Sequence, residues 1–195
     1  MAIKPIEFPY DTSAVTERLF KEHMSLYRGY CEKFNEITAR LGEDPKLRPE
    51  ANKTYSRYRG LKRGESFSMG GALLHELYFQ NMVNSPEQPG ALFNTLTKKY
   101  YGGFGNWAVD FAACAKSARG WCVTVMEQRS GTVRNILMDS HDEGLIIGAY
   151  PILVADVYEH AYFMDYGANA AAYLGRFIES VKWSAVDARL SRIKT

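Results

Sequence analysis

Apolar side chains recur at a helical spacing through the first part of the chain. Residues 13–42 carry apolar or aromatic side chains every three or four positions, with charged residues between them. This spacing gathers the apolar side chains on one face, so it predicts one long helix over 13–42. Gly42 and the proline-containing run after it predict a loop. Apolar positions recur again after Gly70-Gly71, which predicts a second helix following that pair and hence a helical hairpin.

The pattern continues as short helices beyond the next loop. Residues 90–118 read as two helices broken at 102–105, where three glycines occur in four positions. Glycine is a frequent helix terminator, which supports a break there. The end of the chain is predicted to be helical from about Tyr158 onward.

Between these helices the periodicity is typical of strands. Residues 121–127 and 132–138 are rich in Val, Thr and Ile and flank a turn signal, and 149–156 is a third strand candidate. The order predicts an α+β fold, with a helical hairpin domain over 1–88 and a C-terminal α/β domain over 89–195 that contains a three-stranded antiparallel sheet.

Composition narrows the class of protein. With 195 residues and 46% hydrophobic content, the chain can bury a sizeable core. A net charge of +2 lacks the excess of basic residues typical of nucleic-acid binding, so we expect no nucleic-acid partner. The apolar stretch 146–157 is shorter than the ~20 residues of a membrane span, so we expect no membrane insertion. No apolar signal core follows the start, and the three cysteines fit a reducing compartment, which predicts a cytoplasmic protein.

Histidine and aspartate supply the candidate chemistry. The chain has four histidines, and His160 lies four residues after Asp156 at the end of the third predicted strand. Imidazole and carboxylate ligands together suit iron or manganese. The same residues also fit a structural explanation, with Asp156 at a strand end, His160 on the surface and His75 as a hydrogen-bonded core histidine. Both interpretations follow from the residues alone.

Two segments resemble a known family. Residues 70–82, GGALLHELYFQNM, resemble the second-helix motif of the iron/manganese superoxide dismutases, in which a histidine ligand follows a glycine pair. Residues 156–166, DVYEHAYFMDY, resemble the family signature with an aspartate and a histidine ligand four apart. Further matches occur in order between these segments and at both ends. The chain therefore resembles this family over nearly its whole length.

The resemblance implies a metal-dependent enzyme. It implies that His75, Asp156 and His160 bind one iron or manganese ion per subunit, with Trp121 as an apolar wall of the metal pocket. The implied activity is the conversion of superoxide to dioxygen and hydrogen peroxide, with the metal cycling between +2 and +3. Superoxide is thus the expected small-molecule substrate.

Further roles are implied around this ligand set. Tyr30 matches the gateway tyrosine, and His141 matches the residue that hydrogen-bonds the metal-bound water, so both are candidate catalytic residues. Gly71 stands where typical iron enzymes have a glutamine, which leaves the choice between iron and manganese open. Glu159 resembles the residue that reaches the partner subunit's ligand histidine, which implies a homodimer.

One ligand position departs from the family. Counting back from Tyr30 without a gap places Glu22 at the first ligand position, and His23 follows one residue later. One residue is about 100° of helix rotation, so the two are not interchangeable on an unbroken helix. We predict Glu22 as the fourth ligand, with His23 or water as the alternatives.

Three entrance positions depart as well. Leu26 replaces a channel histidine, Phe163 its partner tyrosine, and Ala170 an anion-steering arginine. Loss of the positive charge predicts slower capture of superoxide. The alternative function is therefore a superoxide dismutase-like metal-binding or structural protein with lost or altered activity.

Overall fold

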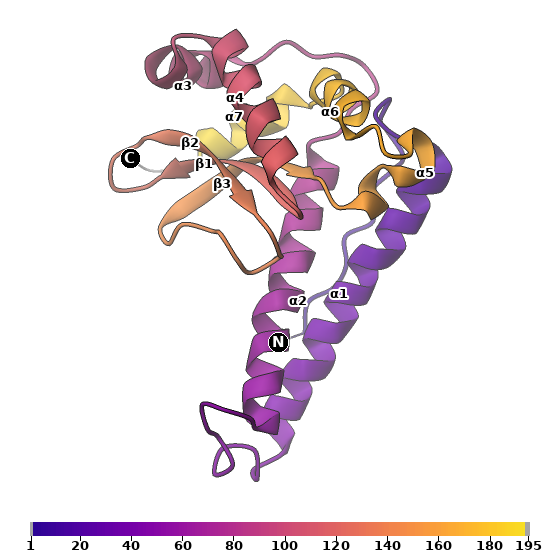
Figure 1. Cartoon of the computed structure of the whole chain (residues 1–195), viewed down its shortest axis with the longest axis vertical. Helices are drawn as coiled ribbons and strands as arrows, with labels where there is room; N and C mark the ends of the chain where they lie inside the picture. Colours follow the sequence, from indigo (N-terminus) through magenta and orange to yellow (C-terminus); the bar gives the residue numbers. More distant parts are fainter. Residues whose placement is uncertain (1, 194–195) are drawn as a thin grey trace.

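Two long helices form a hairpin along one side of the protein. The computed structural model describes residues 2–193. Helix α1 (Glu17–Glu43) and helix α2 (Arg57–Gln80) run side by side and project beyond the rest of the chain (Figure 1). Thr16 and Ser56 accept hydrogen bonds from amide groups in the first turns of α1 and α2, which satisfies donors left free at a helix start. The predicted first helix and the hairpin are confirmed.

Helix α2 begins earlier than predicted. It starts at Arg57, so Gly70 and Gly71 lie inside it and the prediction that the helix follows them is wrong. The pair serves close packing rather than helix termination, because a Cβ atom on Gly70 would lie 2.1 Å from the carbonyl oxygen of His141. The start signal is Ser56, which caps the helix.

The second half opens with the two short helices that the glycines predicted. Helix α3 (Ala91–Tyr101) ends at Gly102, whose φ of +78° is the left-handed conformation that favours glycine, and α4 (Phe104–Ser117) follows. The N-cap residue of α3 is Gly90, which has no side chain to accept hydrogen bonds from the first-turn amides. Asp187 does so instead, because its carboxylate accepts from the first-turn amides of Leu92 and Phe93 at 3.0 Å each.

The sheet has the predicted three antiparallel strands. Strands β1 (Trp121–Glu127), β2 (Val133–Met138) and β3 (Ala149–Asp156) are arranged in the order β2-β1-β3. The register pairs Trp121 at the start of β1 with Asp156 at the end of β3. The strand ends therefore bring a large aromatic side chain next to the candidate ligand.

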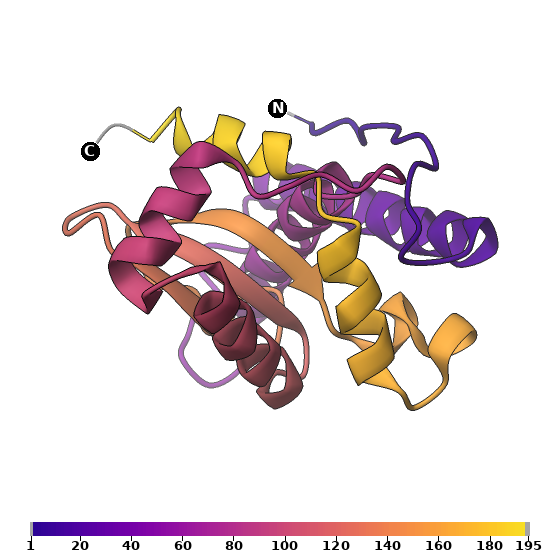
Figure 2. The same ribbon diagram turned by 90° about the horizontal axis from the view of Figure 1, so that it is seen from above.

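Helices complete the chain and cover the sheet. After β3 come a short 3₁₀ turn (Glu159–Ala161), α5 (Phe163–Tyr166), α6 (Ala170–Glu179) and α7 (Trp183–Leu190). Helix α4 packs on β1 and β2, whereas α2 packs on β3, so the sheet lies between the two (Figure 2). One apolar core runs from α1 and α2 through the sheet to α7.

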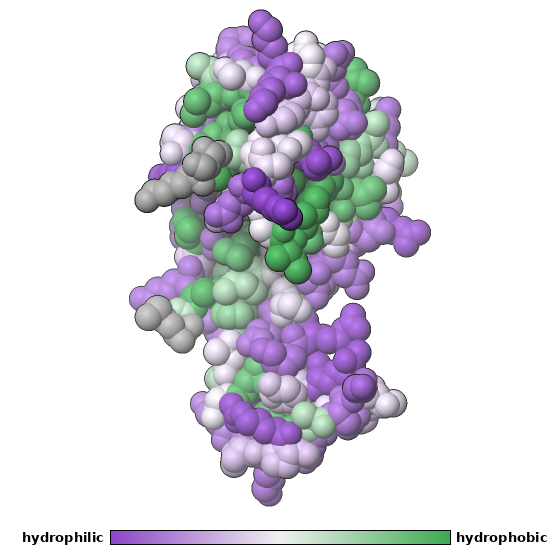
Figure 3. Space-filling model, turned by 90° about the vertical axis from the view of Figure 1, so that its left-hand side faces the viewer, coloured by the Kyte–Doolittle hydropathy of each residue, from purple (hydrophilic) through white to green (hydrophobic). Residues whose placement is uncertain are grey.

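The far end of the hairpin has a small core of its own. Ile37, Leu41 and Leu47 are buried there, with Tyr58 and Leu61 packed against them. This end, at the bottom of Figure 3, presents mainly hydrophilic residues on the face in view. The hairpin tip, residues 37–61, is therefore stabilised separately from the main core.

Two features bear on the environment of the protein. Cys31 and Cys122 are buried free thiols, and Cys114 is a half-buried one. Within residues 2–193, no helix combines the length and apolar character that crossing a membrane requires.

Candidate metal centre

Helix α1 turns His23, not Glu22, toward the interior. His23 is 1% exposed, whereas Glu22 is exposed, so the structure contradicts the placement of Glu22 among the ligand candidates. Helix α1 is unbroken from Glu17 to Glu43. Seven residues of regular helix turn through about 700°, within about 20° of two full turns, so His23 and Tyr30 share one face. The ungapped count placed the ligand eight residues before Tyr30, which on this regular helix is about 80° away from that face.

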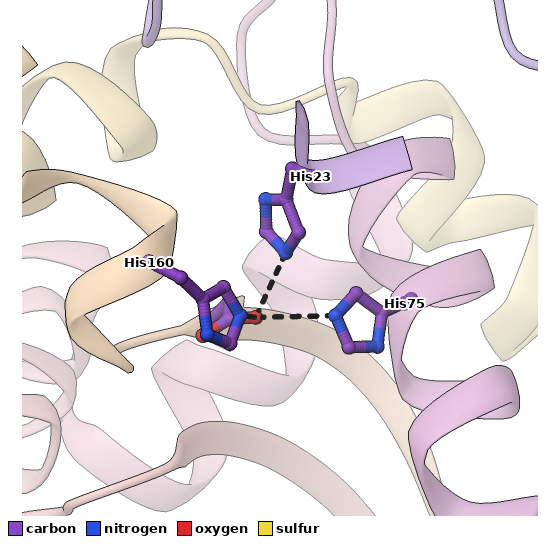
Figure 4. Close-up of side chains that lie close together, drawn as sticks. His23, His75 and His160 are labelled. Atoms are coloured by element: carbon purple, nitrogen blue, oxygen red, sulfur yellow. Dashed lines mark hydrogen bonds and ion pairs between the residues drawn. The ribbon is translucent and has the colours of Figure 1, made fainter. Parts of the chain in front are cut away.

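Four side chains gather their donor atoms at one buried point. His23 from α1, His75 from α2, Asp156 from β3 and His160 from the 3₁₀ turn offer ligand atoms that all lie within 4.8 Å of one another. The three imidazoles point at the Asp156 carboxylate (Figure 4). Its Oδ2 atom lies 3.1 Å from Nε2 of His23, 3.2 Å from Nε2 of His160 and 3.6 Å from Nε2 of His75.

His75 carries the clearest sign of a missing ligand partner. Its Nδ1 donates to the carbonyl oxygen of Gly71 at 2.6 Å, and a carbonyl can only accept, so the proton is on Nδ1. Nε2 is then a bare lone pair. It is buried and has no hydrogen-bond partner, because Asp156 at 3.6 Å is too far. Burial lowers the pKa of His75 to about 3, so the ring stays neutral and able to bind a cation.

The Asp156 carboxylate is oriented and charged. Its Oδ1 accepts from the backbone amide of Tyr158 at 2.9 Å, which leaves Oδ2 facing the histidines. Burial alone would raise the pKa of Asp156, but hydrogen bonds from His160 and His23 outweigh it and lower the pKa. For His160, burial lowers the pKa, but the bond to Asp156 outweighs it and the pKa is raised. A buried carboxylate among three imidazoles is a donor set suited to iron or manganese.

An aromatic layer encloses one side of this cluster. The Trp121 ring lies 4.9 Å from the His75 ring, and the Tyr30 ring lies 5.3 Å from it. Nε1 of Trp121 donates to Nδ1 of His141 at 2.9 Å, so neutral His141 carries its proton on Nε2. Burial lowers the pKa of His141 to about 4, which keeps it neutral near pH 7. Trp121, Tyr30 and His141 thus lie around the ligand candidates, and the roles given to them from the sequence stay predictions.

Another side of the cluster opens to solvent through a hollow with apolar and charged lining residues. A depression of about 670 Å³ reaches His23 and His160. Its other lining residues include apolar Leu26, Phe163 and Met164 and charged Arg18, Glu22 and Glu159. Leu26 is 42% and Phe163 53% exposed. Ala170 begins α6 and is half-buried. Apolar side chains thus occupy the departing positions 26 and 163, and one arginine and two glutamates lie around the same hollow.

Sequence reasoning left two contributors out of the main assignment. His23 was only an alternative, although its spacing of two helical turns from Tyr30 was a usable signal. Tyr158 was not singled out, yet its ring stacks on His160 at 5.2 Å and lies 5.3 Å from His141. Its position between the two ligands of the signature was the only hint.

Comparisons with known proteins agree with this geometry. The sequence model for the C-terminal domain of iron/manganese superoxide dismutases matches residues 88–189. The manganese superoxide dismutase 1 of Halobacterium salinarum is 30% identical over 191 residues, which cover 94% of this chain and 92% of that protein. The iron superoxide dismutase of Aquifex pyrophilus is 32% identical over 189 residues, covering 94% and 88%. The manganese superoxide dismutase 2 of Haloferax volcanii is 31% identical over 192 residues, covering 96% and 94%. The chain therefore belongs to the iron/manganese superoxide dismutase family.

Proposed function

We propose that this protein is a superoxide dismutase that binds one iron or manganese ion per subunit through His23, His75, Asp156 and His160. The observation that carries the proposal is the buried, unpartnered Nε2 of His75, which faces a buried carboxylate and two further imidazoles. A buried polar atom without a partner costs free energy, and a bound cation would remove that cost. The names of the relatives support superoxide as the substrate.

The bound metal would supply one-electron chemistry by cycling between +2 and +3. The chain's own residues would hold and deliver protons. Burial, with the nearby Asp156 charge, raises the pKa of Tyr30, so its hydroxyl keeps its proton near neutral pH. His141 offers a second proton on Nε2, fixed there by the bond from Trp121. Two superoxide ions and two protons yield one dioxygen and one hydrogen peroxide, so two fixed donors match the requirement.

The choice of metal stays open on these residues. Gly71 leaves no side chain beside Tyr30, because a Cβ atom there would lie 2.8 Å from the tyrosine ring. The hydrogen-bond donor toward the metal centre is therefore His141, which lies in the C-terminal part of the chain that contains the sheet. We propose that the site accepts either iron or manganese.

A matched pair of variants tests the ligand set. We expect His23→Gln to lose stoichiometric metal and superoxide consumption, and Glu22→Gln on the adjacent exposed position to keep both. Metal content is measured by elemental analysis, and superoxide consumption by pulse radiolysis after loading with Mn²⁺ or Fe²⁺. Loaded wild-type protein that binds metal at one per subunit but leaves superoxide unconsumed would favour the altered-activity alternative instead.

We also propose a homodimer formed around the hollow that leads to the metal centre. Glu159 is exposed at its rim, and His160 uses Nε2 toward Asp156, so its Nδ1 is left for a carboxylate of a second copy. Exposed Phe163 and Met164 supply apolar surface for the contact. Analytical ultracentrifugation should give a dimer for the wild type and a shift toward monomer for Phe163→Asp.

Two further assignments are proposals of the same kind. A domain boundary between residues 88 and 89 is supported by the family match, which begins at residue 88. A cytoplasmic location is supported by the three free thiols, which suit a reducing compartment.

A further inference from the structure

One of the two edges of the sheet, formed by β3, is bonded to side chains instead of to a fourth strand. Strand β3 lies at the edge of the order β2-β1-β3. Carbonyls two residues apart on a strand point to the same edge, and those of 152, 154 and 156 each accept from a side chain. The donors, in that order, are Arg189 Nη1 at 2.8 Å, Asn81 Nδ2 at 2.9 Å and the Tyr173 hydroxyl at 2.9 Å. We call these three residues the edge ladder.

The edge ladder also holds helix α2. Asn81 directly follows the last residue of this helix and accepts from Arg189 through its own side-chain oxygen. Arg189 Nη2 donates to the carbonyl oxygen of Leu77 at 3.3 Å, one of the last four carbonyls that an α-helix leaves unpaired. The Tyr173 hydroxyl lies 3.1 Å from that of Tyr78, also on α2.

These bonds connect the two elements that carry opposed candidate ligands. His75 lies on α2, two residues before Leu77. Asp156 is the last residue of β3, and its backbone carbonyl accepts the hydrogen bond from Tyr173. His75 and Asp156 have no direct hydrogen bond, since 3.6 Å separates their nearest atoms. Their separation is therefore set by the packing of α2 against β3. Asn81 and Tyr173 are fully buried, so water does not compete for their bonds.

We propose that Asn81, Tyr173 and Arg189 are positioning residues for the metal centre, which set the separation of His75 from Asp156 by bonding the edge of β3 to α2. This inference rests on the proposed function only in assuming that the four-residue cluster binds a metal. None of the three side chains is placed among the ligands or the proton donors, so their effect is transmitted through the two elements that they join.

The sharpest test removes one hydroxyl. Tyr173→Phe deletes the donor to the Asp156 carbonyl and keeps the ring, and Tyr166→Phe is the matched control because its hydroxyl donates to the carbonyl of Ala14, outside the ladder. We expect Tyr173→Phe to weaken Mn²⁺ affinity by about 10–100-fold, the range found when residues that orient ligands are lost. It should also change the Mn²⁺ electron paramagnetic resonance spectrum. Tyr166→Phe should leave affinity and spectrum at wild-type values, although it too loses one hydrogen bond.

A second series guards against a variant that does not fold. Arg189→Met removes every side-chain hydrogen bond of that residue. Arg189→Lys keeps a cationic donor that can still bond some of the same acceptors. The Mn²⁺ affinity should therefore be highest in the wild type, lower in Arg189→Lys and lowest in Arg189→Met. Wild-type affinity and spectrum in both Tyr173→Phe and Arg189→Met would overturn the inference. Absence of Mn²⁺ binding by the wild type would instead overturn the proposed function, so the two failures are distinguishable.

Discussion

Three of the four glycines on helix α2 give one prediction in which the same change to alanine stabilises at one position and destabilises at the other two. Each Gly→Ala change gains about 0.5–1 kcal/mol, because alanine loses less backbone freedom when the helix forms. Gly60 has open space around an added Cβ atom, with nothing within 4 Å. Gly60→Ala should therefore stabilise the protein by that full amount.

The same change at the glycine pair meets neighbours. At Gly71 the new Cβ atom would lie 2.8 Å from Cγ of Tyr30, and the ring is held by its packing on His141 at 4.6 Å. Moving the ring by more than half an ångström is overpacking, which costs about 1–3 kcal/mol and leaves Gly71→Ala less stable than the wild type. At Gly70 the obstacle is the backbone carbonyl of His141 at 2.1 Å, which cannot rotate away. Gly70→Ala should lose about 3 kcal/mol or more.

Urea unfolding of the metal-free proteins, followed by circular dichroism, measures these differences. The expected order of stability is Gly60→Ala, wild type, Gly71→Ala, Gly70→Ala. Gly71→Ala should also lower superoxide consumption of the loaded protein, because Tyr30 is displaced. A Gly70→Ala protein as stable as Gly60→Ala would refute the close approach of α2 to the His141 segment.

Three further outcomes are expected. Asp187→Ala removes the cap of α3 and should lower the free energy of unfolding, measured in urea titrations, by about 1–2 kcal/mol. Metal content should stay at the wild-type value, and a loss of metal would contradict a purely capping role. Because the pKa of His75 is about 3 in the folded protein and 6.5 ordinarily, the unfolded chain binds more protons at this group between these values, so His75 alone should contribute a loss of roughly 2 kcal/mol to the metal-free protein as pH falls from 7 to 5. The His75→Leu variant should lack that part of the pH dependence, and an unchanged profile would rule out His75 as its source. Arg18 at the hollow is accompanied by Glu22 and Glu159, so no net positive charge there attracts superoxide. The rate of superoxide consumption should therefore change by less than about twofold between low and physiological ionic strength, and a steep decrease with salt would refute this by showing attraction by positive charge.

Local patterns in the sequence predicted much of the fold. Strands 121–127 and 149–156 and the break at 102–105 follow from side-chain type and glycine content, which act over a few residues. The start of α2 was missed because a glycine pair has the same appearance whether it ends a helix or lets a distant segment approach. Only the tertiary contact with His141 distinguishes the two.

The candidate site shows the same limit. His75, Asp156 and His160 were found through motifs, and the structure brings them together. Choosing His23 over Glu22 required knowing that α1 is regular over its whole length, because the two-turn spacing from His23 to Tyr30 places both on one face only if the helix is unbroken. Arg189 offered no signal, since its partner Ile152 on β3 is 37 residues away in the sequence and its partner Leu77 on α2 is 112 residues away.

The separate small core at the hairpin tip has a consequence for how the protein opens. Ile37, Leu41 and Leu47 contact one another and their neighbours on α2, but not the core that surrounds the metal centre. Breaking this cluster exposes few apolar groups, so the tip can unfold and refold at a lower free energy than the whole chain. Local unfolding of the tip leaves the segments of α1 and α2 that carry His23 and His75 packed in the main core. Amide exchange and proteolytic cleavage at the tip can thus occur in molecules whose ligand cluster is intact.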